Sequence, residues 1–227
     1  MRQTALFQTP FVSPAANAPE AYPHDRVLQP GRSLAGLWAT AGLLRTDITT
    51  GFNGKAGTAV GIPLDLNLCF RSASGGQTAL ARHAVYVWHA DAAGQYSVFN
   101  RIDTNYLRGI GITDARGRVR FRTIYPGTYR GRPPHIHFEV YRNLDALGMG
   151  ASRLIRSRIL LPDAVSRSIY AGSAAYHDSF QRYNELMFDL PVTHPEHDHR
   201  AVQVATVSTS GRGELRASLN VHLDPVP

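Results

Sequence analysis

Cysteine is almost absent from this chain, since Cys69 is the only one among 227 residues. No disulfide can therefore form within the chain. A structural zinc site is also disfavoured, because such sites draw largely on cysteine thiolates.

Long hydrophobic runs are missing as well. No apolar stretch is long enough to cross a bilayer. The N-terminal segment MRQTALFQTPFVSPAANAPEAYP lacks the continuous apolar core of a secretory signal. We therefore expect a cytoplasmic protein without a membrane partner.

Lysine is as scarce as cysteine, although the chain is basic. Its 24 basic residues outnumber 17 acidic ones, giving a formal charge of +7, and Lys55 is the only lysine. A nucleic-acid-binding protein gathers its basic residues on one face or in a recognisable motif. Here the arginines are spread singly along the chain, so we expect no nucleic-acid partner. A positive pocket that attracts an acidic or phenolic small molecule stays compatible with this charge.

Helical periodicity is weak, and two-residue alternation of apolar and polar residues dominates. The alternation predicts strands at 64–70, 84–89, 118–123, 135–141 and 215–223. Only residues 163–188, which open with Pro162 and Asp163, favour one or two short helices. Many short strands joined by turns predict an all-β fold: an antiparallel β-sandwich core with a few short helices.

The N-terminus differs from the rest of the chain. Residues 1–34 have no sustained periodicity and carry prolines at positions 10, 14, 19, 23 and 30. We interpret this segment as an irregular arm and residues 35–227 as one sandwich domain. Sandwich domains often expose sheet edges that pair, which leaves a homo-oligomer open.

The densest chemical signal is the H-x-H motif formed by His135 and His137. Side chains repeat every two residues along a strand, so both imidazoles lie on one face and can bind one metal ion. Two histidines on a solvated strand face are the simpler alternative. Tyr129 lies six positions before His135, and Tyr96 follows an expected central strand and a glycine turn. Both phenols could reach the same centre.

Tyrosine among the donors favours a hard cation. Fe(III) can hold a phenolate deprotonated well below its free pKa of about 10. A competing interpretation is a non-haem Fe(II) site, which needs two histidines and one carboxylate. Glu139 or Asp91 could supply that carboxylate.

Two segments carry a resemblance to a known family. YVWHADAAGQYS and LRGIGITDARGRVRFRTIYPGTYRGRPPHIHFEV resemble the intradiol ring-cleavage dioxygenases, and the likeness extends from about Ala39 to the C-terminus. It is strongest to short, single-domain members related to protocatechuate 3,4-dioxygenase subunits. The resemblance implies a β-sandwich enzyme that uses non-haem Fe(III) and O2 to open the ring of a catechol-type substrate.

The resemblance also implies roles for particular residues. Tyr96, Tyr129, His135 and His137 would be the iron ligands, and Tyr129 would leave when a catechol binds. Arg132 would stabilise negative charge on the substrate. Thr40 and Gly42 match a segment that lines the family's substrate pocket, although Leu43 stands where a proline is usual.

One position departs from the family in a way that affects function. Arg158 aligns with a glutamine near the active-site arginine, so a second cation would lie in the pocket. Our hypothesis is that Arg158 binds an acidic substituent of the substrate. The alternative is a binding module of the same fold that has lost turnover.

Two other sets of histidines have simpler explanations. Those at 194, 197 and 199 lie among prolines and acids, typical of a surface loop. His89, beside Trp88, is expected to be a hydrogen-bonded packing residue.

Overall fold

The computed structural model describes residues 42–73, 76–129, 132–147, 153–185, 203–210 and 214–223. The expected arm at 1–34, the pocket candidate Thr40 and the histidines at 194, 197 and 199 lie outside these ranges. The elements are β1 (Pro63–Ser72), β2 (Ala84–His89), β3 (Arg108–Ile112), β4 (Arg118–Ile124), β5 (His135–Tyr141), β6 (Arg153–Leu160), α2 (Asp163–Gly172), the 3-10 helix η2 (Ala174–Tyr176), α3 (His177–Glu185), β7 (Gln203–Val204), β8 (Thr206–Thr209) and β9 (Leu215–Leu223).

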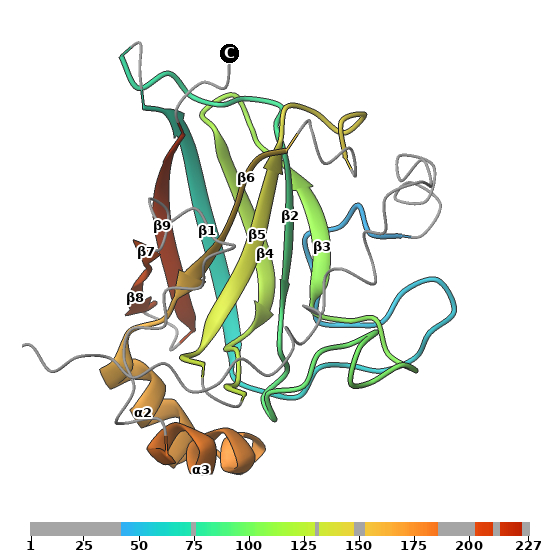
Figure 1. The fold of residues 1–227 in the computed structure, drawn as a ribbon, viewed down its shortest axis with the longest axis vertical. Coiled ribbons are helices and arrows are strands. Elements are labelled where there is room, and N and C mark those ends of the chain that lie inside the picture. Colours follow the sequence, from blue (N-terminus) through green and yellow to red (C-terminus); the bar gives the residue numbers. More distant parts are fainter. Residues whose placement is uncertain are drawn as a thin grey trace, which may run out of the picture.

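Within the described ranges the strands form two sheets that face each other (Figure 1). One has the order β4-β1-β9-β8 and the other β3-β2-β5-β6-β7. The predicted β-sandwich is thus confirmed. Most neighbouring strands are antiparallel, but β1 pairs with β9 and β6 with β7 in parallel. Parallel neighbours need a long connection between them, and alternation within single strands does not reveal such pairs.

The four-stranded sheet follows the alternation in the sequence. Leu64, Leu66, Leu68 and Phe70 of β1 are at most 1% exposed and form the core between the sheets. The arginines of β4 at positions 118, 120 and 122 lie on the exposed outer face. One face of this sheet is therefore core and the other is surface, as expected for an antiparallel sheet.

The five-stranded sheet is different because its central strands are buried on both faces. All residues of β2 and β5 are buried. Ile136 and Phe138 of β5 point into the core between the sheets, whereas Tyr141 belongs to a second apolar cluster on the outer face. That second cluster includes Leu43, Tyr96 and Leu147 from the connecting segments. These segments cover the outer face and keep water from it.

Helices α2 and α3 lie together at one end of the sandwich (Figure 1). Tyr170 and Tyr176 stack at 5.4 Å, and Tyr170 also packs edge-on against Tyr125 and Tyr183. The helical signal at 163–188 is confirmed as far as residue 185. Among the helices that the structure describes, none has the length and apolar character needed to cross a membrane.

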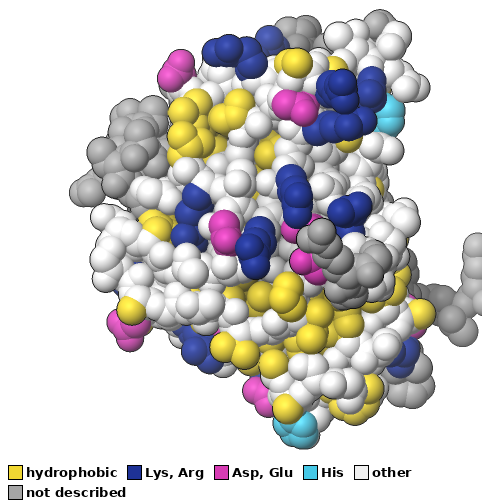
Figure 2. All heavy atoms as spheres, turned by 180° about the vertical axis from the view of Figure 1, so that it is seen from behind, with side chains coloured by type: hydrophobic (Ala, Val, Ile, Leu, Met, Phe, Trp, Pro, Cys, Tyr) yellow, Lys and Arg dark blue, Asp and Glu magenta, His cyan; other side chains and the backbone are white. Residues whose placement is uncertain are grey.

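The surface carries charges of both signs. On the face shown in Figure 2, the described arginines are interspersed with carboxylates, and hydrophobic side chains gather mainly in the lower half of the view. Arginines of β4 pair with acids: Arg120 with Asp65 at 2.5 Å, and Arg122 with Asp47 at 4.0 Å. The charges of these two arginines are therefore partly neutralised by neighbouring carboxylates.

His89 links the two sheets from within the core. Its Nδ1–H donates to the carbonyl of Ala90 at 2.8 Å, so Nε2 accepts the hydroxyl of Thr123 at 2.6 Å. The side chain is 1% exposed, as expected for a hydrogen-bonded packing residue. Desolvation, chiefly, lowers the pKa of His89 to about 4 from its usual 6.5.

This depressed pKa predicts a loss of stability in acid. Between pH 6.5 and 4, His89 is protonated in the unfolded chain but not in the folded chain. The free energy of unfolding therefore decreases as the pH is lowered through this range. The expected loss from this group between pH 7 and 4.5 is about 2–3 kcal/mol. Urea unfolding of the wild type and of His89→Gln at both pH values measures it. An identical pH dependence in the two proteins would contradict the prediction.

Candidate functional site

Four side chains singled out in the sequence come together on the outer face of the five-stranded sheet. His135 Nε2 lies 3.0 Å from His137 Nε2 and 3.5 Å from Tyr96 Oη. Tyr96 Oη lies 3.2 Å from His137 Nε2, and Tyr129 Oη lies 3.4 Å from His135 Nε2. Donor atoms that share one small cation, with bonds of about 2.0–2.1 Å, lie roughly 3 Å apart. The spacing therefore fits a single ion.

Burial decides against the simpler explanation of the histidine pair. His135 is 3% exposed and His137 is 1% exposed, so they do not lie on a solvated face. The Nδ1–H of His135 donates to the carbonyl of Pro133 at 2.7 Å, which leaves the Nε2 lone pair directed at the other three donors. Metal-binding imidazoles are commonly oriented by such a hydrogen bond.

Tyr96 and Tyr129 lie at the ends of two loops that contact each other. Asp91 Oδ1 accepts the backbone N–H groups of Ala93 and Gln95, forming the turn that leads to Tyr96. Gly127, two residues before Tyr129, donates its N–H to the carbonyl of Asp91 at 3.0 Å. The 91–95 turn and the 125–129 segment thus form one unit at the end of the sheet.

The carboxylates of the competing Fe(II) interpretation are engaged elsewhere. Glu139 is fully buried and accepts hydrogen bonds from Arg156, Arg153 and the Tyr141 hydroxyl. Asp91 is used by the turn and by an ion pair with Arg101 at 3.2 Å. Among the described residues, no three His, Cys, Asp or Glu side chains gather into one metal-binding group. The two-histidine, one-carboxylate site is therefore not supported.

The donor cluster packs against an aromatic ring, and a buried arginine holds the backbone beside it. Trp88 of β2 stacks on His137 with centroids 4.9 Å apart and 5° between the planes. Arg108, which is 2% exposed, donates to the Tyr86 hydroxyl and to the hydroxyl and carbonyl of Ser97. Because Ser97 directly follows Tyr96, Arg108 holds the backbone next to Tyr96 in place. The sequence gives no local signal for this role, which depends on β3 lying beside β2.

The environment of Tyr96 opposes ionisation when no cation is present. Desolvation raises the pKa of its phenol well above 10, and the neighbouring Tyr129 raises it further. Arg108 and Arg132 act in the opposite direction. A cation at the centre of the four donors would offset the cost of a buried phenolate.

Comparisons with known proteins match the part of the chain that carries these side chains. A family model described as a dioxygenase matches residues 52–153, which contain all four converging side chains. Over 70 residues the chain is 44% identical to the protocatechuate 3,4-dioxygenase beta chain of Burkholderia cepacia. Its fold is similar to that of an intradiol ring-cleavage dioxygenase from Tetranychus urticae, with a TM-score of 0.58. Part of this chain is therefore similar in sequence to intradiol ring-cleavage dioxygenases.

These sequence matches cover only part of each protein, so they say nothing about the rest of either chain. The Burkholderia match covers 25% of this chain and 30% of that protein. A chlorocatechol 1,2-dioxygenase of Pseudomonas putida is 31% identical over 83 residues, covering 28% of this chain and 32% of the other. The chain therefore matches about a third of the length of these curated relatives. The Tetranychus structure is 20% identical, over 82% of this chain and 88% of that one, and speaks for the fold alone.

Arg132 lies close to the donor cluster. Its backbone N–H donates to the carbonyl of Tyr129 at 3.0 Å, and its carbonyl accepts the Thr128 hydroxyl. Its Nη1 is buried and has no hydrogen-bond partner among the described residues. A buried donor without a partner is costly, and a bound anion would satisfy it.

Arg158 and Gly42, the other described pocket candidates, are placed differently. Arg158 is 5% exposed and pairs directly with His137 across β5 and β6. A Cβ added at Gly42 would lie 3.2 Å from the ring of Phe52, which packs against the cluster containing Tyr96. Arg158 is thus an immediate neighbour of the donors, whereas Gly42 is linked to that cluster through Phe52.

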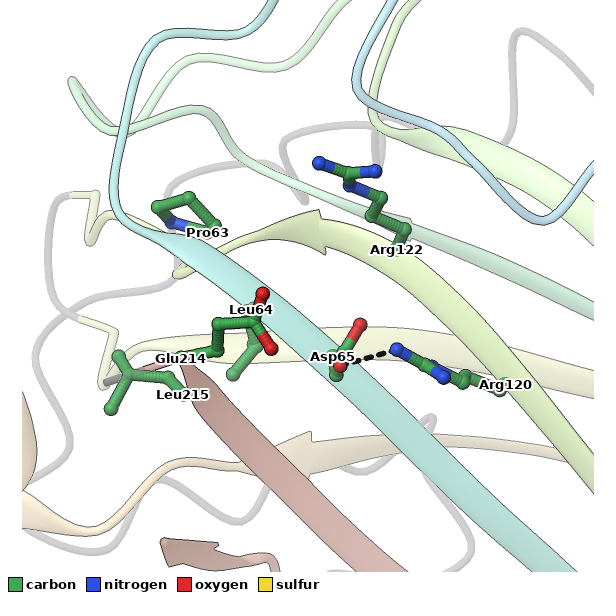
Figure 3. Close-up of a pocket in the computed structure, with 7 residues that line it drawn as sticks. All are labelled: Pro63, Leu64, Asp65, Arg120, Arg122, Glu214 and Leu215. Atoms are coloured by element: carbon green, nitrogen blue, oxygen red, sulfur yellow. Dashed lines mark hydrogen bonds and ion pairs between the residues drawn. The ribbon is translucent and has the colours of Figure 1, made fainter. Parts of the chain in front are cut away.

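A separate hollow lies on the four-stranded sheet (Figure 3). It has a volume of about 120 Å³, and its charged lining residues are Asp65, Arg120, Arg122 and Glu214. The Asp65–Arg120 ion pair extends across it (Figure 3). The candidate ligands do not line this hollow, and two of its charged residues pair with each other, so we assign it no role in the candidate site.

Proposed function

We propose that this chain is a non-haem Fe(III)-dependent intradiol dioxygenase. It would open a catechol-type ring between the two hydroxyl-bearing carbons, adding both atoms of O2 and giving a cis,cis-muconate-type diacid. The observation that carries the proposal is the convergence of Tyr96, Tyr129, His135 and His137 in a buried cluster with spacings of 3.0–3.5 Å. When bound there, Fe(III) would supply a Lewis-acidic, electron-accepting centre for a catecholate.

The two tyrosines have different surroundings, which suits different roles. Tyr96 is 2% exposed, whereas Tyr129 is only partly buried. In the proposal, Tyr96 remains a fixed ligand together with His135 and His137. The Tyr129 oxygen gives way to the substrate and takes the proton of a catechol hydroxyl.

Arg132 supplies positive charge where the substrate becomes negative. Its buried Nη1 would donate to an oxygen of the catecholate. Because hydrogen bonds hold the backbone of Arg132 beside Tyr129, little reorganisation is needed when charge develops. The apolar cluster around Leu43, Tyr96 and Leu147 would keep bulk water away from the ring.

The decisive measurement is a visible absorption spectrum of the iron-supplied protein, taken before and after a catechol is added without oxygen. We expect a broad tyrosinate-to-Fe(III) band that shifts on addition, followed by muconate formation when O2 is admitted. A colourless, unresponsive protein would contradict the iron proposal. A spectral shift without product would instead support the alternative, a binding module of the same fold that has lost turnover.

Arg158 suggests the kind of catechol. Its buried position opposite His137 leads us to propose that it binds an acidic substituent, such as the carboxylate of protocatechuate. A hydrogen bond to a charged group contributes about 1.5–3 kcal/mol. Arg158→Gln should therefore lower the ratio of kcat/KM for protocatechuate to that for catechol by roughly tenfold or more.

A neighbouring arginine provides the control for this prediction. Arg156 lies on the same strand and pairs with Glu139, so Arg156→Gln should change stability rather than the substrate ratio. An unchanged ratio in Arg158→Gln would remove Arg158 from substrate recognition. It would leave the dioxygenase proposal itself standing.

A further inference from the structure

A single buried hydroxyl connects the two loops that carry Tyr96 and Tyr129. Ser179 of α3 donates its Oγ–H to the carbonyl of Ala92 at 2.6 Å. The same oxygen accepts the backbone N–H of Thr128 at 2.9 Å. Its side chain is fully buried. The two bonded residues lie four positions before Tyr96 and one position before Tyr129.

The loops that carry Tyr96 and Tyr129 are in close backbone contact near Ser179, which leaves little room for either to move. A Cβ atom on Gly127 would lie 2.4 Å from the carbonyl oxygen of Asp91 and 2.6 Å from Ser179 Oγ. A Cβ on Gly94 would lie 2.0 Å from the carbonyl oxygen of Thr128. Because both loops are packed backbone to backbone, a change in the contact at Ser179 is transmitted to both of them.

Other bonds from the helical layer act on one loop each. Arg182 of α3 donates to the carbonyl of Ala93 at 2.6 Å. Tyr170 of α2 donates to the carbonyl of Pro126 at 2.8 Å, and Tyr176 donates to that of Tyr125 at 2.7 Å. Among these contacts, the Ser179 hydroxyl is the one that bonds to both loops.

We propose that Ser179 is a positioning residue that sets the separation of the Tyr96 and Tyr129 phenolic oxygens. It does not touch the donor cluster; it acts through the backbone of residues 92 and 128. Helix α3 thereby takes part in the site from outside the sheet. The inference rests on the proposed function for its consequence in metal binding, but the positioning itself is a property of the metal-free chain.

The test compares Ser179→Ala with Ser166→Ala. Ser166 of α2 is an equally buried serine whose hydroxyl bonds to the Tyr125 hydroxyl at 2.7 Å and the Pro162 carbonyl at 2.9 Å. Both variants lose buried hydrogen bonds, but the bonds of Ser166 to Tyr125 and Pro162 reach neither the 91–95 turn nor the backbone of 126–129. It controls for a general loss of stability.

Two readouts are measured on the full chain. The first is 19F NMR of the metal-free protein labelled with 3-fluorotyrosine, with the resonances of Tyr96 and Tyr129 assigned by Tyr→Phe substitution. The second is retention of Fe(III) and the position of the visible band. In Ser179→Ala we expect both resonances to shift and Fe(III) affinity to fall by about tenfold or more, as for residues that orient metal ligands. Ser166→Ala should move the Tyr125 resonance and leave the other two unchanged.

Each outcome is decisive. If Ser179→Ala matches Ser166→Ala in both readouts, the positioning role is wrong. If the wild type binds no iron, the proposed function fails, whereas the fluorine comparison still decides the role of Ser179. Should Ser179→Ala not fold, Ser179→Cys keeps the shape with a weaker hydrogen-bonding group. It is expected to give smaller shifts in the same two resonances, and unchanged resonances would overturn the proposal.

Discussion

Removal of both phenols, as Tyr96→Phe with Tyr129→Phe, is expected to abolish tight Fe(III) binding and the visible colour. Tyr96 Oη lies 3.2 Å from His137 Nε2, and Tyr129 Oη lies 3.4 Å from His135 Nε2, so the substitution deletes two of the four donors. Changes to residues that merely orient ligands cost about 10–100-fold in metal affinity. Loss of two donors should cost at least about 100-fold. Metal analysis after dialysis and the visible spectrum measure it.

The matched control is Tyr141→Phe. Tyr141 is a buried tyrosine on β5, and its hydroxyl donates to Glu139 at 2.6 Å. This variant removes a buried phenol near the site but no proposed ligand, so iron and colour should remain. If the Tyr96→Phe, Tyr129→Phe protein keeps its iron and its ordinary colour, the four-ligand model is wrong.

Strand positions could be predicted from the sequence because alternation is a local signal. Leu64, Leu66 and Leu68 alternate with polar residues, and the structure gives β1 one buried and one more exposed face. The same pattern in β5 is misleading on its own. His135 and His137 occupy the polar positions of that strand and yet are buried, because segments distant in the sequence cover them. Covering by loops is a tertiary effect that strand periodicity does not encode.

The residues that support the site were harder to predict than its donors. The candidate phenols and imidazoles are recognisable because three of them lie within nine positions of one another and because the chain resembles a family with such ligands. Ser179 and Arg108 have no such chemical signature. Their hydrogen bonds to Thr128 and Ser97 join parts of the chain that are 51 and 11 positions apart. Only the packing of α3 and β3 against the site makes these contacts evident.

Gly94→Ala is expected to be among the most destabilising single substitutions in this chain. Gly94 has a φ of +77°, a conformation that costs a residue with a Cβ about 1–2 kcal/mol. Its added Cβ would also lie 2.0 Å from the carbonyl oxygen of Thr128, and such overpacking costs a further ~1–3 kcal/mol. The free energy of unfolding should fall by about 2–5 kcal/mol, as measured by urea denaturation.

Gly54→Ala separates the two causes of that loss. Gly54 has nearly the same φ, +78°, but nothing lies within 4 Å of an added Cβ. It should therefore lose only the ~1–2 kcal/mol that belongs to the backbone conformation. Because the clash at Gly94 pushes the Tyr96 loop away from the Tyr129 loop, Gly94→Ala should also weaken Fe(III) retention in the protein that remains folded, while Gly54→Ala should not. Equal losses of stability in the two variants would mean that the Tyr96 and Tyr129 loops can separate at little cost in free energy. The close contact between these loops would then play no part in holding the two phenols together.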